Sequence, residues 1–508
     1  MSLSAHNQSS NDSTVPANDD SVANNARTAI NDTIVAISTP PGRGGIGIVR
    51  LSGPQAVAIA TPLLRLRHSL VAAQARFAEV LDPSTGQRMD EAVVTWFAAP
   101  HSYTSDDIVE IAAHSAPVVL EFLVRACISG GARLARPGEF TERAFLSGRL
   151  DLTQAEAVRD LIDAQTLYQA RIASEQLDGA LSRRIRPIKQ KLVDLIVALE
   201  AGIDFAEDDI DVMPSAAILL RIAAVAEPLQ ELAAGFDYGR IVRDGFSLAI
   251  VGRPNAGKSS LFNRLVQRER AIVTATPGTT RDLVSERVSL GGIPIDLMDT
   301  AGIRESFDEA ETIGIQKSRE AVADADVVLL VLDATATELD VYEHKLLEQL
   351  TGRRALIACN KIDLQSQVET GKSQTEVANT ILAPEKKTLV STVTIPHKTL
   401  IPSSVPVLPT SAVTGEGIIE LQEQILSLVR GNGVETEGSL VTNLRQQQAV
   451  TAAVEGLISG RMAVETQVPH EMLLLDLYNA LRALDTLTGE TTADDILNQI
   501  FSTFCIGK

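Results

Sequence analysis

One stretch of the chain has the residue types and spacing that bind a nucleoside phosphate. Residues 252–259 read GRPNAGKS and match the pattern GxxxxGK followed by Ser or Thr. They follow the apolar run FSLAIV and precede a helix expected from about Ser260, which is the context of a phosphate-binding loop. Backbone amides of such a loop surround phosphates, Lys258 reaches the β- and γ-phosphates, and the Ser259 hydroxyl binds Mg²⁺. The loop alone is compatible with ATP, with GTP or with a chance match.

Three further motifs select guanine. Residues 299–302 (DTAG) end an apolar run 41 residues after Lys258 and bring a carboxylate toward Mg²⁺ and a glycine amide toward the γ-phosphate. Residues 360–363 (NKID) follow the run ALIAC, and Asp363 can accept hydrogen bonds from guanine N1–H and from its 2-amino group. Residues 411–413 (SAV) follow another apolar run and offer a backbone amide to guanine O6. We therefore predict a guanine-nucleotide domain.

The position that orients the attacking water in many GTPases is occupied by an apolar residue. A Gln often follows the DxxG glycine, whereas this chain has Ile303 there. An acidic residue further along is an alternative, and each candidate is also compatible with a solvated surface charge. The nearby acids are Glu305, Asp308, Glu309 and Glu311, and the nearby candidates for an arginine finger are Arg281 and Arg304.

The segments around these motifs predict a domain inserted into another. FSLAIV, IPIDLMD, DVVLLVLD and ALIACN are continuous apolar runs, as in a parallel sheet covered on both faces, and they place an α/β domain at 246–430. Within it, 365–408 is rich in Ser, Thr, Gln, Lys and Pro and is expected to be a loop insertion. The flanking segments 149–245 and 431–508 show helical periodicity and are expected to form one discontinuous helical domain. Asp151 with Gln154 predicts a capping box, and Pro187 is expected at the start of a helix.

The first part of the chain predicts a tail followed by a small α+β domain. Residues 1–30 carry no apolar run and are expected to be a disordered tail. Over 31–148 we expect strands at TIVAIST and IGIVRLSG, joined by a tight loop, and further strands at EAVVTWFAA and IVEIAAH. A helix is expected over 118–128, followed by a loop over RPGEFTERAF.

The charge balance, the cysteines and the hydropathy of the chain exclude several classes of protein. The 508 residues suggest about three domains, and 65 acidic against 45 basic residues argue against non-specific coating of nucleic acid. Cys127, Cys359 and Cys505 are far apart, which excludes a disulfide scaffold and a cysteine zinc site. The sequence shows no signal or transit peptide and no membrane-spanning run, so we expect a cytoplasmic protein.

The chain resembles the MnmE (TrmE) family of bacterial tRNA-modification GTPases over about 33–508. TPPGRGGIGIVRLSG near the start, GRPNAGKSSLFN with TPGTTRD in the middle, and FCIGK at the end carry the resemblance. It implies a multidomain α/β and α+β fold, with an N-terminal folate-binding and dimerisation domain, a discontinuous helical domain and an inserted Ras-like P-loop GTPase domain. It also implies a potassium-dependent GTPase that adds a carboxymethylaminomethyl group to carbon 5 of the wobble uridine of tRNA.

The same resemblance implies cofactors and partners. A tetrahydrofolate derivative (5-formyl or 5,10-methylene) supplies the one-carbon unit, and GTP, Mg²⁺ and K⁺ serve the GTPase domain. The chain forms a homodimer and a heterotetramer with the flavoprotein MnmG (GidA), which brings FAD.

Individual positions carry these implied roles. Folate-binding positions are Arg50, Glu110, Arg149 and Lys508, with Arg149 standing where a Lys is common. K⁺ ligands are Asn255, Thr274, Thr276 and Thr279, and Mg²⁺ ligands are Ser259 and Thr280. Glu311 matches the residue that orients water, and Cys505 either acts as a nucleophile or thiolate or lines the folate pocket without reacting. The full set of nucleotide-binding positions is Asn255, Ala256, Gly257, Lys258, Ser259, Ser260, Thr274, Thr276, Thr279, Thr280, Asp299, Thr300, Ala301, Gly302, Asn360, Lys361, Asp363, Ser411, Ala412 and Val413.

Two other functions share the GTPase motifs. One is a switch GTPase that binds ribosomal RNA or the ribosome and modifies nothing. The N-terminal Gly/Arg loop and the CIGK terminus favour tRNA modification over it, because such a switch typically adds a basic RNA-binding module. The other is a folate enzyme with a vestigial nucleotide domain, which the complete set of nucleotide motifs disfavours.

Overall fold

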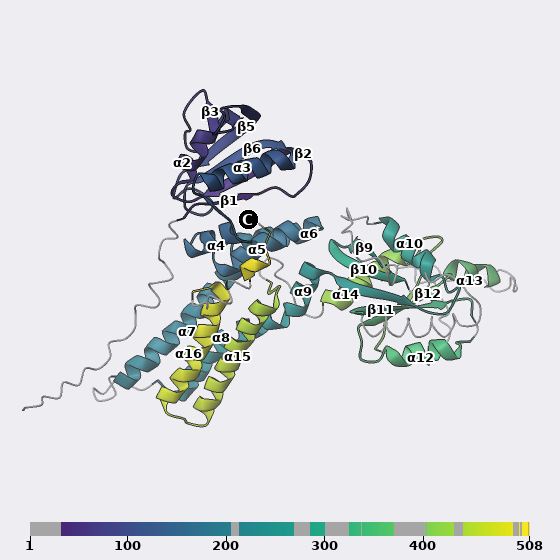
Figure 1. Cartoon of the computed structure of the whole chain (residues 1–508). Helices are drawn as coiled ribbons and strands as arrows, with labels where there is room; N and C mark the ends of the chain where they lie inside the picture. Colours follow the sequence, from purple (N-terminus) through teal and green to yellow (C-terminus); the bar gives the residue numbers. More distant parts are fainter. Residues whose placement is uncertain are drawn as a thin grey trace, which may run out of the picture. The chain divides into compact units, whose positions relative to one another are not determined.

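The chain divides into two compact units. The structure, a computed structural model, describes residues 32–204, 213–268, 285–299, 325–336, 338–369, 401, 404–430, 440–490, 497, 500–505 and 507 (Figure 1). One unit comprises 1–150 with 494–508, and the other comprises 151–493. Among the described helices, none combines the length and the apolar character needed to cross a bilayer.

A seven-stranded sheet forms the frame of the first unit, in the order β3-β4-β5-β6-β2-β1-β7. Its strands are β1 (Ile34–Ile37), β2 (Gly44–Ser52), β3 (Leu64–Leu66), β4 (Ala75–Leu81), β5 (Arg88–Phe97), β6 (Ile108–Ser115) and β7 (Arg133–Leu134). Neighbouring strands are antiparallel except for β1 and β7, which are parallel. The strands predicted from the first apolar runs are therefore confirmed.

Alternation along the strands gives this sheet two different faces. Val35, Val49 and the other inward residues of one face pack against helices α2 (Ala56–Ala60) and α3 (Pro117–Ser129). On the opposite face of β1, Ile34 and Ala36 pack against Phe140. Successive side chains of a strand point to opposite sides, so β1 serves two cores.

The prediction of a loop over 136–145 is wrong, because most of this segment forms helix α4 (Glu139–Leu146). Gly138 precedes the helix with a φ of 67°, and a Cβ at this position would lie 2.6 Å from the carbonyl oxygen of Phe501. Phe140 is fully buried against β1. The helix is stabilised by tertiary packing, which its short and highly charged sequence does not reveal.

The end of the chain packs on the first unit. A Cβ on Gly507 would lie 2.2 Å from the carbonyl oxygen of Ile37, so only glycine allows the tail to approach β1 this closely. The aromatic ring of Phe501 lies 6.4 Å from that of Phe145 on α4. The sequence had assigned all of 431–508 to the helical domain, whereas the structure groups 494–508 with the N-terminal unit.

A six-stranded sheet in the second unit carries the nucleotide motifs. Its order is β13-β12-β11-β8-β10-β9, and its only antiparallel pair among the described strands is β9 with β10. The strands are β8 (Phe246–Val251), β9 (Ser285–Leu290), β10 (Ile293–Asp299), β11 (Val327–Asp333), β12 (Ala355–Asn360) and β13 (Val407–Pro409).

Helices cover both faces of this sheet, as the continuous apolar runs predicted. Helices α10 (Lys258–Arg268) and α14 (Ile418–Arg430) contribute to the core on one face. Helix α12 (Val341–Gln349) contributes to the core on the other, and α13 (Ile362–Glu369) follows β12. Most of the predicted 365–408 insertion lies outside the described residues, and its two ends belong to α13 and β13.

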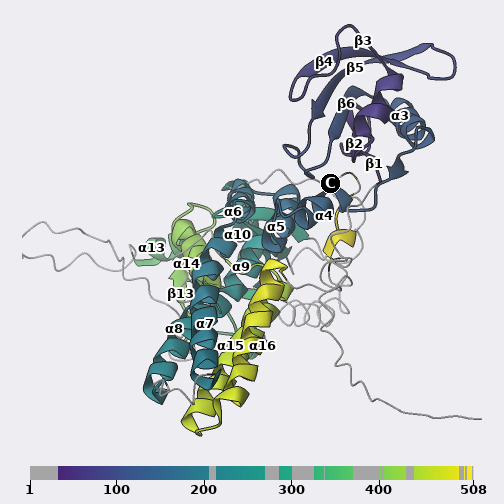
Figure 2. The same cartoon turned by 90° about the vertical axis from the view of Figure 1, so that its left-hand side faces the viewer.

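Four long helices from two distant segments share one core in the same unit. They are α7 (Ala180–Asp204), α8 (Ser215–Ala234), α15 (Leu444–Glu465) and α16 (His470–Thr488). Figures 1 and 2 show these four helices running side by side. This confirms the discontinuous helical domain with an inserted nucleotide-binding domain. The shorter helices α5 (Leu152–Asp163), α6 (Leu167–Leu177) and α9 (Phe236–Asp244) also belong to this unit.

Two predictions about helix starts had different outcomes. The capping box of Asp151 and Gln154 is present at the start of α5. Pro187, expected at a helix start, lies inside α7 instead. The apolar stripe of that helix already includes Leu181 and Ile185, and burial of these side chains offsets the hydrogen bond that an internal proline removes.

Candidate functional site

The phosphate-binding loop connects β8 to α10 in the second unit. Lys258 is the first residue of α10, and its ammonium donates hydrogen bonds to the carbonyl oxygens of Gly252 and Arg253, both at 2.9 Å. Asn255 has a φ of 65°, a conformation that Asn tolerates better than most residues. Asn255, Ser259 and Ser260 are exposed, while Ala256 is buried beneath the loop. The loop therefore has a buried floor and an open side lined by polar groups.

Asn360 joins this loop to the two guanine motifs. Its Nδ2 donates to the carbonyl oxygen of Ala256 at 3.0 Å, and its Oδ1 accepts from the backbone N–H of Ala412 at 3.0 Å. A Cβ at Gly257 would lie 2.1 Å from the same Nδ2, so the loop and the asparagine fit together only with glycine there. Ser411 donates its hydroxyl to Asp363 at 2.6 Å, which fixes the carboxylate that sequence assigns to guanine.

A second carboxylate, which the sequence did not single out, fixes Lys361. Asp333 ends β11, and its Oδ2 accepts from the Lys361 ammonium at 2.8 Å. Burial of Asp333 opposes ionisation, but hydrogen bonds from Lys361 and Thr335 outweigh it and lower the pKa of Asp333 to about 2. The one sequence signal was that Asp333 ends a continuous apolar run, and only the pairing of β11 with β12 brings it to Lys361.

The remaining nucleotide positions are only partly described. The last residue of β10, Asp299, pairs in register with Ile250 near the end of β8, which places its backbone at the same edge as the phosphate-binding loop. The side chain of Asp299 lies outside the described residues, as do Thr274, Thr276, Thr279, Thr280, Thr300, Ala301, Gly302 and Glu311. The structure thus brings together residues 252–260, 360–363 and 411–413.

Three of the positions assigned to folate meet in the first unit. Arg50 and Glu110 are register partners on β2 and β6, and the Arg50 guanidinium contacts Glu110 Oε1 at 2.7 Å. The guanidinium carbon of Arg50 lies 5.6 Å from the ring centroid of Phe140. Arg149 donates to the carbonyl oxygen of Ser102, and its guanidinium carbon lies 5.8 Å from the ring centroid of Tyr103. Each of the two cations thus lies against an aromatic ring, Arg50 is also paired with a half-buried carboxylate, and both charges act on Tyr103.

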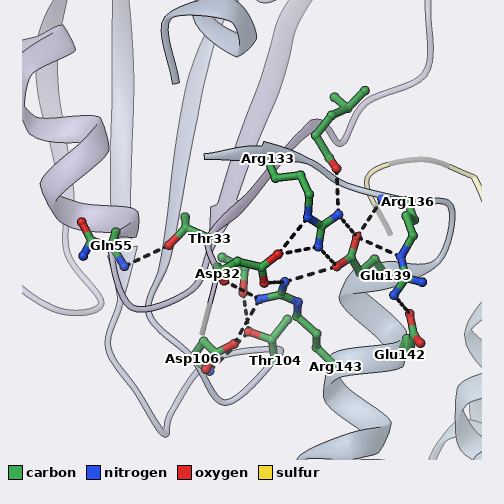
Figure 3. Close-up of polar contacts among 12 residues, drawn as sticks. Asp32, Thr33, Gln55, Thr104, Asp106, Arg133, Arg136, Glu139, Glu142 and Arg143 are labelled. Carbon is green, nitrogen blue, oxygen red and sulfur yellow. Dashed lines mark hydrogen bonds and ion pairs between the residues drawn. The ribbon is translucent and has the colours of Figure 1, made fainter. Parts of the chain in front are cut away.

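An ion-pair network holds the helix that supports this cluster. Glu139 of α4 accepts from Arg133 at 2.6 Å and from Arg143 at 3.2 Å, and Arg143 also contacts Asp32 at 2.7 Å (Figure 3). Burial alone would raise the pKa of Glu139, but the hydrogen bonds from Arg133 and from the backbone of Arg136 outweigh burial and lower it. The network fixes α4 against β1 and β7, and α4 in turn supplies Phe140 to the cluster.

The carboxyl terminus approaches the same strands. Ile37, which Gly507 touches, is adjacent to Ala36, and Ala36 pairs in register with Arg50. The backbone N–H of Gly138 donates to the carbonyl oxygen of Cys505 at 3.5 Å. Lys508 lies outside the described residues. The tail is therefore bound close to the Arg50 strand pair.

The three cysteines differ in exposure. Cys127 and Cys359 are buried, and burial raises the pKa of each thiol to about 12. Each packs in a hydrophobic core, Cys127 in the N-terminal unit and Cys359 on one face of the nucleotide-binding sheet. Cys505 is exposed.

Within the second unit, α6 connects the nucleotide-binding sheet to the helices. Thr166 donates its hydroxyl to the carbonyl oxygen of Gly292 in the β9–β10 turn at 2.5 Å. Nearby, a cavity of about 100 Å³ is lined by residues of α5, α6 and α9, including Asp160 and Arg243. Arg243 donates to Asp160 at 2.8 Å, but burial dominates and raises the pKa of Asp160 to about 6.

Comparison with known proteins agrees with this architecture. Residues 33–149 match the family model of the GTP-binding protein TrmE N-terminus, and residues 152–505 match that of the MnmE helical domain. The tRNA modification GTPase MnmE of Koribacter versatilis (strain Ellin345) is 58% identical over 483 residues, which cover 94% of this chain and 100% of that protein. The protein of the same name from Alkaliphilus oremlandii (strain OhILAs) is 38% identical, with 94% of this chain and 100% of that protein covered. Among solved structures, the G domain of the FeoB iron transporter of T. maritima is 26% identical, covering 36% of this chain and 98% of that chain with a TM-score of 0.22. The chain therefore belongs to the MnmE family of tRNA modification GTPases.

Proposed function

We propose that the chain is the GTP-hydrolysing subunit of a complex that adds a carboxymethylaminomethyl group to carbon 5 of the wobble uridine of tRNA, with a tetrahydrofolate as the one-carbon donor. The convergence of Arg50, Glu110, Arg149 and the tail residue Gly507 in one unit carries this proposal. Two guanidinium groups suit the anionic parts of a folate, and a carboxylate beside them can accept hydrogen bonds from a pterin. Lys508 follows Gly507 directly and would add a third positive charge.

In this proposal the chain binds both the phosphates and the guanine base of the nucleotide. The backbone amides of 252–259 and the Lys258 ammonium bind the phosphates. Asp363, oriented by Ser411, accepts from guanine, and the Ala412–Val413 backbone lies beside O6. Asn360 keeps the phosphate and guanine loops at a fixed separation. Glu311 orients the attacking water, because Ile303 has no polar atom on its side chain.

Mg²⁺ and K⁺ fit the donors on the open side of the loop. Ser259 is exposed in the first turn of α10 and suits Mg²⁺, and Thr280 would be its second ligand. Asn255 is exposed and its backbone is in the left-handed conformation. Its side-chain oxygen would hold K⁺ together with Thr274, Thr276 and Thr279. When bound, these cations supply positive charge near the phosphates, as an arginine finger does in other GTPases.

The proposed assembly is a homodimer that forms a heterotetramer with the flavoprotein MnmG. Support for self-association comes from the outer face of the N-terminal sheet. Phe77 of β4 and Val93 of β5 are register partners there, and both are about half exposed, as is Met89. An exposed apolar patch on a sheet commonly marks an interaction surface. The partner MnmG would bring FAD to the complex, and tRNA would bind to the complex as the substrate.

Mass spectrometry of tRNA nucleosides tests the proposal. A strain that lacks the protein should lose the carboxymethylaminomethyl uridine, and the full chain should restore it. A chain that ends at Phe504 should fail to restore it, because Cys505 and Lys508 are missing, while Cys505→Ser distinguishes a reacting thiol from one that only lines the pocket. Unchanged modified nucleosides in the deletion strain would refute the proposed chemistry.

A further inference from the structure

Tyr103 lies close to two of the arginines that the resemblance assigns to folate, Arg50 and Arg149. The resemblance assigns no role to Tyr103 itself. It lies in the loop between β5 and β6, and its hydroxyl is 2.9 Å from the Thr141 hydroxyl of α4. Thr141 is fully buried. The Arg149 guanidinium carbon lies 5.8 Å from the Tyr103 ring centroid, and Arg149 also donates to the carbonyl oxygen of the preceding residue, Ser102. The loop thus holds one guanidinium by a carbonyl and by a ring.

This arrangement suits arginine rather than lysine. A guanidinium is planar, so it can place one face on an aromatic ring and still direct N–H groups outward from its edge. An ammonium is a compact, strongly hydrated charge on a flexible stem, and it does not stack. At a position where the resemblance gives a Lys as common, this chain thus has a side chain whose planar group lies against the ring.

We propose that Tyr103 is a positioning residue of the folate site, whose ring fixes the Arg149 guanidinium in the orientation that binds an anionic group of the folate. The inference rests on the proposed function. It assigns Tyr103 no contact with the one-carbon unit and no part in proton transfer.

The surroundings of Tyr103 keep its ring in place and uncharged. The Thr141 hydroxyl is on α4, which the Arg133–Glu139–Arg143 network fixes against β1 and β7. Burial raises the pKa of Tyr103, and this effect outweighs the hydrogen bond with Thr141 and the positive charges of Arg50 and Arg149. A neutral phenol adds no negative charge beside Arg149, so the positive charge of that guanidinium stays available to an anion.

Binding of 5-formyltetrahydrofolate to the full-length protein, measured by isothermal titration calorimetry, tests the inference. Tyr103→Leu should raise the Kd about three- to tenfold, the range expected for a partly buried cation–π contact. Tyr103→Phe keeps the ring and should stay within about twofold of the wild type. Phe122→Leu is the matched control, because Phe122 packs on the α3 side of the same sheet, and it should not change the Kd.

A double-mutant cycle separates positioning from a general structural effect. In the Arg149→Lys background, Tyr103→Leu should raise the Kd less than it does in the wild type, because an ammonium has no planar face that the ring could orient. An equal loss in both backgrounds, or an unchanged Kd in Tyr103→Leu, would overturn the inference. Near-ultraviolet circular dichroism reports whether each variant is folded.

Two remaining outcomes are also decisive. If Tyr103→Leu does not fold, Tyr103→Met takes its place in the cycle, because methionine is also apolar and carries no ring, and the same two results support or overturn the inference. If the wild-type chain binds no folate at all, the proposed function fails and this inference fails with it. Folate binding that ignores Tyr103 refutes the inference alone.

Discussion

Asn360 is the residue whose loss should most directly separate the phosphate and guanine loops. It is 1% exposed and satisfies two backbone groups, the carbonyl of Ala256 and the N–H of Ala412. Asn360→Ala removes both partners at once. Leaving a buried polar group without a partner costs about 1–3 kcal/mol, so two such groups cost about 2–6 kcal/mol.

Part of this cost should appear as lost nucleotide affinity. We propose that the two loops that Asn360 joins hold opposite ends of the nucleotide. A loss of about 3 kcal/mol in the bound state then corresponds to a Kd about 100-fold higher. Fluorescence titration with a GDP or GTP analogue measures this Kd. We expect most of the change in the dissociation rate, because encounter with the open loop does not require the bridge.

Asn443→Ala is the matched control. Asn443 is also an asparagine of the second unit, and its side chain accepts a hydrogen bond from the backbone N–H of Gln446 at 2.9 Å as the N-cap of α15. Its loss should lower stability by about 1 kcal/mol without changing nucleotide affinity. A folded Asn360→Ala protein with a Kd within about threefold of the wild type would refute the bridging argument.

Three further perturbations have definite expected outcomes. Asp363→Asn should weaken GTP binding and improve binding of a xanthine nucleotide, as measured by the same titration, and unchanged GTP affinity would remove the guanine assignment. GTP hydrolysis should be faster in K⁺ than in Na⁺ at equal ionic strength. Asn255→Gly keeps the left-handed backbone but removes the side-chain oxygen, so it should abolish this difference in rate. Equal wild-type rates in the two salts would contradict the proposed role of K⁺. Because the pKa of Asp160 is raised from 3.8 to about 6, the folded state binds this proton more tightly, and the contribution of Asp160 to stability should rise as pH falls from about 7 to 4, by up to about 3 kcal/mol. Asp160→Asn should flatten this part of the pH profile in chemical unfolding, and identical profiles for the two proteins would contradict the burial of Asp160.

The nucleotide-binding fold was predictable because its signals are local. Each strand of the parallel sheet is a continuous apolar run, and each motif follows the strand that positions it, as with NKID after β12. The discontinuous helical domain was also predictable, since its four helices keep their apolar periodicity on both sides of the insertion. Asp333 was missed because a single Asp after a strand has no distinctive spacing, and only the parallel pairing of β11 with β12 brings it to Lys361.

The first unit was harder to predict because its helix α4 depends on partners that are distant in sequence. Arg143 reads locally as one charge among several in a polar segment, which is typical of a solvated loop. Its side chain is 2% exposed, because Asp32 approaches it from 111 residues upstream. Its other partner, Glu139, is 1% exposed. Removing one partner of this buried pair costs about 3–5 kcal/mol, so the network holds α4 firmly against the sheet. A buried charge and a solvated one look alike in sequence, and the difference arises only when the fold brings the opposite charge to it.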